Sequence, residues 1–258
     1  MSDIPQIFDN RLRRVRRARA AARFDAFSFL ADAVGAELSE RIEAAGREFS
    51  RAAFAGARTP MPARTGAFIR GDVEPVFAGP GGVVFDEEHM PFAARTLDLY
   101  ASVLTLHAVN DLPGALTQIR RCLKPGGLFV AGLFGGETLR ELRECLALAE
   151  IEIDGGLSPR VSPFADVRDA GGLLQRAGFD EPVADVDTIS VAYEHPVKLF
   201  ADLRGMGETN ILAERRRTFL KRAILTRACD IYFEKYRDSS GRVPATFQIL
   251  YMTGRVTR

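Results

Sequence analysis

The chain has 258 residues, of which 47% are hydrophobic and 27% charged, and its mean hydropathy is close to zero. This length and composition support a full hydrophobic core and exclude a disordered or collagen-like chain. No stretch approaches the ~18 apolar residues of a membrane span and the N-terminus lacks the apolar core of a secretory signal, so we expect a cytoplasmic protein. Three scattered cysteines, Cys122, Cys145 and Cys229, fit neither a disulfide framework nor a zinc site, and we expect no metal.

The net charge of +1 hides an uneven distribution. Residues 1–23 contain seven arginines and two aspartates, a net charge of +5, which leaves −4 for the rest of the chain. Apolar Phe8, Leu12 and Val15, with Ala18 and Ala22, recur at the spacing of an amphipathic helix, and a second apolar helix follows to about Glu43. The sequence thus predicts a basic helical segment over residues 1–45.

The arginines of this segment have two interpretations. The plainer one is a solvated helix face, and the other is a surface that docks an acidic partner protein or makes peripheral contact with an anionic membrane. Nucleic acid is disfavoured as a partner because no aromatic residues interleave with the arginines and no recognition helix follows.

From about residue 50, short apolar runs separated by Gly and Pro turns alternate with helical stretches. This alternation predicts an α/β fold, a doubly wound and mostly parallel seven-stranded sheet behind an N-terminal helical cap. We expect one domain over residues 46–258, with a lid over 195–236. The predicted strands are 52–55, 66–69, 82–85, 96–104, 128–133, 183–193 and 246–256, and the predicted helices are 111–123, 137–151, 166–177, 196–204 and 213–236.

The most specific motifs lie in the middle of the chain, where residues 86–92 read DEEHMPF and residues 123–127 read LKPGG. This block resembles the second half of a class I S-adenosylmethionine-dependent methyltransferase. The resemblance implies S-adenosylmethionine as cofactor, with Asp86 and Glu87 beside the adenine amine. Ser102 and Leu104, at the end of the fourth strand, would line the methionine end. Ligands of open α/β sheets lie across the carboxyl ends of the strands, where these residues fall.

More narrowly, the chain is similar to bacterial relatives of the mitochondrial complex I assembly factor that hydroxylates an arginine of a complex I subunit. It is more distantly similar to the malonyl-carrier methyltransferase of biotin synthesis. The resemblance implies a protein substrate and a place in respiratory complex I maturation, through either methylation or arginine hydroxylation. It is carried by residues 7–14 (IFDNRLRR), 110–116 (NDLPGAL), 133–142 (LFGGETLREL), 202–210 (DLRGMGETN) and 243–254 (VPATFQILYMTG).

The sequence departs from the methyltransferase pattern at the first strand. That strand ordinarily ends in an acid and a glycine-rich loop, because glycine lets the backbone approach the cofactor. Here Phe54 stands near the expected acid, Gly56 is retained, and Arg58 and Pro60 stand near the expected second and third glycines. Proline cannot adopt a positive φ and arginine fills volume, so this departure predicts impaired cofactor binding.

Other candidate site residues follow the strands. Asp72 can accept from both ribose hydroxyls of the cofactor, or it can simply solvate a loop. His107 and Asn110 are the candidate catalytic residues after the fourth strand. His107 can act as a general base or orient a substrate carboxylate, or it can cap the strand end. Arg204, Glu208 and Asn210 are candidates to bind a substrate guanidinium or carboxylate if the glycine-rich stretch 204–210 is a lid rather than a helix-capping loop.

Two functions therefore stay open on sequence alone. The first is an S-adenosylmethionine-dependent enzyme that acts on a protein. The second is a pseudo-methyltransferase that has lost cofactor binding and serves as a protein-binding or assembly module. The loop from Gly56 to Pro60 separates them, because it decides whether the cofactor can bind.

Overall fold

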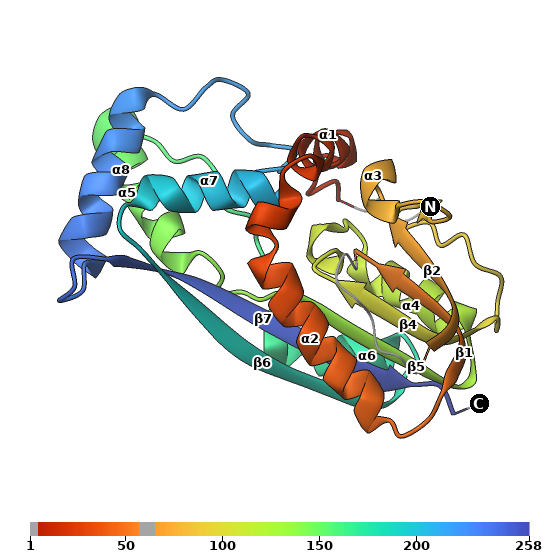
Figure 1. Cartoon of the computed structure of the whole chain (residues 1–258). Helices are drawn as coiled ribbons and strands as arrows, with labels where there is room; N and C mark the ends of the chain where they lie inside the picture. The colour runs from red at the N-terminus through yellow and green to blue at the C-terminus, as the bar shows by residue number, and fades with distance from the viewer. Residues whose placement is uncertain (1–4, 57–64, 258) are drawn as a thin grey trace.

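A computed structural model describes residues 5–56 and 65–257 (Figure 1). Its centre is a seven-stranded sheet with the order β3-β2-β1-β4-β5-β7-β6. The first five strands are mutually parallel, and β7 runs antiparallel between β5 and β6. This confirms the predicted doubly wound, mostly parallel sheet. The strands are β1 Phe49–Ala55, β2 Thr65–Asp72, β3 Val83–Val84, β4 Leu97–Val103, β5 Leu123–Phe134, β6 Asp180–Tyr193 and β7 Val243–Arg255.

Helices cover both faces of the sheet, and each face has its own core. On one face α2, α5, α7 and α8 pack against the sheet around buried Phe54, Leu99 and Phe247. On the other face α4 and α6 pack around Tyr100 and Phe129. The helices are α1 Asn10–Ala21, α2 Phe29–Ala44, α3 Pro75–Ala78, α4 Leu112–Cys122, α5 Arg140–Asp154, α6 Val167–Arg176, α7 Pro196–Met206 and α8 Arg222–Tyr236, with 3-10 turns at Phe24–Phe27 and Leu106–Ala108.

Two predicted helices begin later than expected. The helix expected from residue 213 begins at Arg222, and residues 213–221 form turns and irregular backbone. The helix expected from Glu137 begins at Arg140, because Leu139 adopts a left-handed conformation with φ 57°. The amide of Leu139 donates to Thr246 of β7 at 2.7 Å, and the Thr138 hydroxyl donates to the Gln248 carbonyl at 2.9 Å. These bonds hold the approach to α5 against the sheet and delay the helix.

The buried face of α1 also differs from the prediction. Val15, expected on the apolar face, is 38% exposed, whereas Arg13 and Arg17 are each 4% exposed. The expected solvated arginine face is therefore wrong for these two residues, although Arg11, Arg14, Arg19 and Arg23 are exposed as expected. The reason lies in what α1 covers, which is a set of buried carboxylates at the ends of β2 and β3. Arg13 and Arg17 can be buried there because these carboxylates supply the opposite charge that a buried guanidinium requires.

Candidate functional site

The carboxyl ends of β1, β2 and β4 lie together where the sequence places the cofactor, and α1 lies over them. We call the space between these strand ends and α1 the cleft. Arg17 of α1 donates from Nε to Asp72 Oδ1 at 3.0 Å and from Nη2 to Asp72 Oδ2 at 2.5 Å. Both side chains are buried. Asp72 is the residue expected to accept from the ribose hydroxyls, and here both of its oxygens accept from the chain's own guanidinium.

Arg13 enters the same cleft one turn earlier on α1. Its Nη2 donates to the Thr105 carbonyl at 3.0 Å and its Nη1 to the Ala108 carbonyl at 3.4 Å. The same Nη1 lies 3.9 Å from Oδ1 of Asp86. Arg13 thus fills the space between the end of β4 and the acid after β3.

The expected adenine-side residues form a closed network. Glu87 is buried and accepts from the Tyr100 hydroxyl at 3.0 Å and the Ser102 hydroxyl at 2.9 Å. Burial raises the pKa of Glu87, although these hydrogen bonds and the charge of Arg13 oppose the rise. Asp86 is buried and accepts from the amide of Glu88. The structure therefore gathers Asp72, Asp86, Glu87 and Ser102 around one cleft.

Gly56 and Leu104 mark the floor of the cleft, and both have positive φ, 66° and 49°. A Cβ on Gly56 would lie 2.3 Å from the carbonyl oxygen of Val103, so the close approach of β1 and β4 requires glycine. Leu104 is held by its amide, which donates to Gly132 of β5 at 2.8 Å. Arg58 and Pro60, the substitutions of the glycine-rich loop, lie outside the described residues.

The cleft in this arrangement does not fit S-adenosylmethionine. Between α1 and the strand ends lie three small cavities of about 10, 10 and 20 Å³, each near the volume of one water. Small-molecule pockets typically span about 300–1,000 Å³. The carboxylate that would bind ribose is engaged, and the guanidinium groups of Arg13 and Arg17 occupy the remaining volume. We therefore derive no chemical step through this cofactor.

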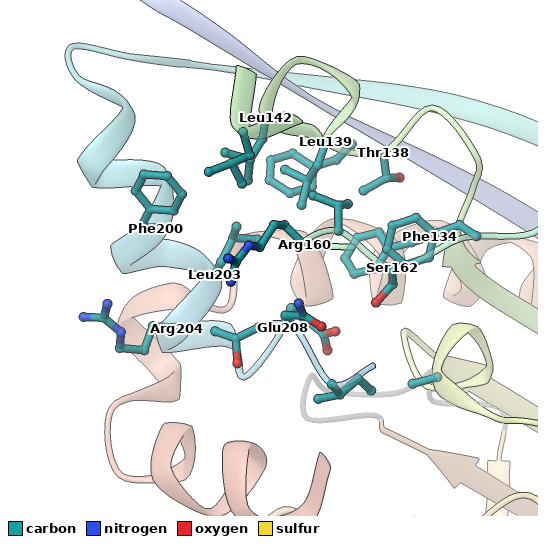
Figure 2. Close-up of a pocket in the computed structure, with 18 of the residues that line it drawn as sticks. Phe134, Thr138, Leu139, Leu142, Arg160, Ser162, Phe200, Leu203, Arg204 and Glu208 are labelled. Atoms are coloured by element: carbon teal, nitrogen blue, oxygen red, sulfur yellow. The ribbon is translucent and has the colours of Figure 1, made fainter. Parts of the chain in front are cut away.

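A separate pocket of about 520 Å³ lies beyond the end of β5, between α5, α7 and the segment 207–220 (Figure 2). Phe200 and Leu203 of α7 form one wall, Phe134 and Ser162 lie opposite, and Arg160 and Glu208 lie between them. Most of the lining is apolar. Arg160 is held by hydrogen bonds from Nε and Nη2 to the buried carboxylate of Glu150.

The polar end of this pocket is built on His107 and Glu208. His107 Nε2 lies 3.0 Å from Glu208 Oε2, and Arg17 Nη1 lies 3.7 Å from Glu208 Oε1. Burial raises the pKa of Glu208, but the charge and hydrogen bond of His107 and the charge of Arg17 lower it below its ordinary value. The His107 ring packs 4.6 Å from the ring of Phe134. His107 Nδ1 and Thr209 Oγ1 are buried and have no hydrogen-bond partner within the described residues.

The other predicted site residues take varied positions. Arg204 lines the pocket from α7 with an exposed side chain, and Asn210 lines it while donating from Nδ2 to the Pro159 carbonyl. The Asn110 side chain accepts from the amide of Phe8 at 2.7 Å, so it anchors the N-terminal segment. Its catalytic role stays a prediction.

Sequence reasoning missed Arg13, Arg17, Arg160 and Thr209 at these sites. The only signal for the first two is the spacing of Arg13, Arg17 and Ala20, which places them on one side of a helix. That spacing does not separate them from the other arginines of the segment. Arg160 and Thr209 carry no local signal, because their places depend on how distant loops fold over α5 and α7.

Neither a metal centre nor a membrane span is seen in the residues that the structure describes. No group of three or more His, Cys, Asp or Glu side chains there is arranged to hold a metal ion. No helix among them is both long enough and apolar enough to cross a bilayer.

Comparisons with known proteins agree with this architecture. The family profile described as "Methyltransferase domain" matches residues 24–131. Among solved structures, the YcgJ protein of Bacillus subtilis superposes with a TM-score of 0.55 at 14% identity, covering 86% of this chain and 98% of YcgJ. The BH2331 protein of Bacillus halodurans gives a TM-score of 0.53 at 14% identity, covering 86% of this chain and 99% of that one. At such identities the likeness shows the fold alone.

Sequence relatives give a narrower assignment. The human protein named "Arginine-hydroxylase NDUFAF5, mitochondrial" is 41% identical over 264 residues, covering 96% of this chain and 76% of the relative. The malonyl-[acyl-carrier protein] O-methyltransferase of Gallionella capsiferriformans is 34% identical over 171 residues, covering 66% of this chain and 56% of that enzyme. Together with the class I methyltransferase fold, these relationships show that the chain belongs to the NDUFAF5 arginine-hydroxylase family.

Proposed function

We propose that the chain acts on an arginine side chain of a protein, in the assembly of respiratory complex I, and that the reaction is hydroxylation of that arginine. One oxygen atom of an external O2 would replace a hydrogen of the arginine as a hydroxyl group, and the other would leave as water with two electrons from an external reductant. The relatives that match nearly the whole chain at about 40% identity are named arginine-hydroxylase. Methyl transfer to the arginine is the other chemistry that the fold family supports. The pocket beyond β5 is the proposed substrate site.

The polar end of that pocket carries the proposal, because it suits a guanidinium. The Glu208 carboxylate can only accept, so Nε2 of a neutral His107 carries the proton and Nδ1 becomes a buried acceptor. A guanidinium offers only donors, which match Nδ1 and the Thr209 hydroxyl. The ring of Phe134 favours a cation over its face, and the apolar lining suits the arginine methylenes. Glu208 supplies the opposite charge, while Arg204 and Asn210 lie on the rim.

His107 is the proposed catalytic residue, since it is the titratable group closest to where the guanidinium would lie. In the neutral form its Nδ1 can accept a hydrogen bond or a proton from the substrate. Glu208 is the proposed positioning residue that holds the His107 ring and tautomer through Nε2.

Mass spectrometry of complex I subunits tests the enzymatic proposal. In a strain that lacks the gene, we expect one subunit arginine to lose an added oxygen atom, or an added methyl group, that it carries in the parent strain. The wild-type gene should restore the modification. A His107→Ala gene should not restore it, whereas Glu43→Gln, at an exposed position of α2, should. If no arginine differs between strains, the enzymatic proposal fails.

The second candidate function is a pseudo-methyltransferase that binds its partner without chemistry. The Arg17–Asp72 pair and the filled cleft favour it, because both remove the space for S-adenosylmethionine. Calorimetric titration with S-adenosylmethionine and S-adenosylhomocysteine separates the two. Micromolar binding would reject the pseudoenzyme, and a flat titration to millimolar ligand in both wild type and Arg17→Gln would support it.

We also propose a complex I subunit as the protein partner. The relatives are named as mitochondrial proteins, and the cytoplasmic location expected from sequence stays a prediction. Copurification of tagged protein with complex I intermediates, compared between wild type and a charge-reversed Arg14→Glu, Arg19→Glu variant, tests whether the exposed side of α1 contributes to this contact.

A further inference from the structure

Helix α1 and the residues before it are held over the cofactor cleft by several hydrogen bonds and ion pairs. Ahead of the helix, Phe8 forms an antiparallel bridge with Leu212, the amide of Asp9 donates to Ile211 at 2.8 Å, and the amide of Ala213 donates to Ile7 at 2.9 Å. Within the helix, Arg13 and Arg17 reach the strand ends. The N-terminal segment, the loop after α7 and the cleft therefore form one connected unit.

Arg17 is the central contact of this unit. Its guanidinium is bonded to both oxygens of Asp72, lies 3.7 Å from Glu208, and lies 5.1 Å from the ring centroid of Phe77. Burial alone would lower the pKa of Arg17, but the charge and hydrogen bonds of Asp72 raise it above its ordinary value. Arg17 therefore stays charged in the cleft and serves as the counterion of Asp72.

A cofactor ribose and Arg17 cannot use Asp72 at the same time. The ribose hydroxyls would need the two carboxylate oxygens that now accept from Nε and Nη2 of Arg17. The cavities left around Asp72, Gly56 and Glu208 hold about one water each. A ribose-bearing ligand can enter only if α1 moves and withdraws Arg17.

We propose that α1 is an autoinhibitory latch. Arg17 binds Asp72 where the cofactor ribose would bind, so the cofactor can bind only when α1 is displaced. The inference rests on the cofactor-using form of the proposed function. Withdrawal of Arg17 also removes the guanidinium beside Glu208 and leaves Glu208 with its hydrogen bond to His107. Opening of the cleft is thereby linked to the polar end of the substrate pocket.

Because the ligand binds only molecules in which α1 is displaced, the apparent Kd equals the intrinsic Kd divided by the fraction of molecules that are open. S-adenosylhomocysteine, titrated by calorimetry, should bind wild type weakly and Arg17→Gln at least about tenfold more tightly, since loss of one charged hydrogen-bonded pair changes an equilibrium by that order. If Arg17→Gln does not fold, Arg17→Lys takes its place in the test. Arg17→Lys keeps the charge but loses the bidentate hydrogen bonds to Asp72, so it should give a smaller gain in affinity. Arg14→Gln, on the exposed side of the same helix, is the matched control and should match wild type.

Asp72→Asn separates a latch from general loosening. It breaks the same ion pair as Arg17→Gln but replaces a carboxylate oxygen with an amide donor, so it should not tighten binding. An equal gain for Asp72→Asn and Arg17→Gln would overturn the proposal, and so would unchanged binding in both Arg17→Gln and Arg17→Lys.

Hydrogen exchange supplies a readout that does not depend on activity. Saturating S-adenosylhomocysteine should speed exchange of the amides of residues 13–21 in the Arg17→Lys variant, because ligand and docked α1 exclude each other. Micromolar binding to wild type with α1 amides still protected would overturn the latch. Tighter binding to Arg17→Gln with no modified arginine in cells would support the latch and reject the proposed function, so the two failures are distinguishable.

Discussion

Gly56 is the residue of the expected glycine-rich loop that the structure describes, and it has no room for a side chain. Its φ is 66°, and a Cβ would lie 2.3 Å from the Val103 carbonyl oxygen and 2.5 Å from Thr105 Cγ2. Replacement by alanine adds a left-handed penalty of about 1–2 kcal/mol and a backbone clash that requires β1 or β4 to shift. We expect Gly56→Ala to lower the free energy of unfolding by about 3 kcal/mol or more, measured by urea denaturation.

Gly46 provides the matched control, because its φ is 69° and nothing lies within 4 Å of the position that a Cβ would take. Gly46→Ala should therefore cost only the conformational penalty of about 1–2 kcal/mol. Equal losses at the two positions would show that the β1–β4 contact at Gly56 is not tight.

Glu208 should make stability depend on pH. Its pKa lies below the ordinary 4.5, because His107 and Arg17 outweigh the effect of burial. A lowered carboxyl pKa adds stability above the unfolded pKa, and this stability is lost as the pH falls through the folded pKa. We expect the urea midpoint of wild type to fall more steeply than that of Glu208→Gln between about pH 6 and about pH 3. Parallel curves of urea midpoint against pH for wild type and Glu208→Gln would contradict this prediction. Glu43→Gln, at an exposed position of α2, is the control.

The site can be predicted in part at the level of single residues. Asp72, Asp86 and Glu87 are predictable because acids that follow strands of a parallel sheet gather at one edge. Arg13 and Arg17 cannot be separated from Arg14 by sequence, because burial of a guanidinium depends on carboxylates that lie 55 and 73 residues away in the chain. Local hydrophobic spacing carries no information on such pairs.

Helix α1 turns the side with Arg13, Arg17 and Ala20 inward, and this orientation can be tested with two substitutions of one kind. Val15 is exposed, whereas Ala20 is buried against the fold. We expect Val15→Arg to change the free energy of unfolding by less than about 0.5 kcal/mol and Ala20→Arg to lower it by more than about 2 kcal/mol, measured by urea denaturation. A larger loss for Val15→Arg than for Ala20→Arg would mean that the apolar face predicted from sequence, and not the side with Ala20, packs against the protein.

The elements of the fold are more predictable than their ends. Strands of the parallel sheet are short apolar runs between turn residues, and sequence locates each within a few residues. The start of α8 lies later than the sequence predicts, because the segment 213–221 has helix-forming residues but is instead tied at its start to Ile7 of the N-terminal segment. The start of α5 differs because bonds to β7 override local propensity at Leu139.

At the scale of the whole molecule, the N-terminal segment and the loop after α7 close over the carboxyl edge of the sheet together. Phe8, Ala108, Ile211 and Leu212 form a buried cluster of their own, apart from the two cores of the sheet. Asn110 adds a hydrogen bond to the amide of Phe8. Regions far apart in sequence therefore share one small packing unit, and we expect this unit to open cooperatively, at a free energy below that of global unfolding.

Phe8→Ala tests this cooperativity. Removing the ring deletes the centre of the small cluster and should cost about 3 kcal/mol locally. Because the cluster lies outside the sheet cores, the loss should fall mainly on local opening. We expect hydrogen exchange to accelerate together in residues 8–17 and 208–213 while β4 and β5 stay protected. Phe219→Ala, fully exposed in the neighbouring loop, should leave all these rates unchanged. Acceleration in residues 8–17 alone would mean that the loop after α7 and α1 move independently, and the latch would then be confined to the helix.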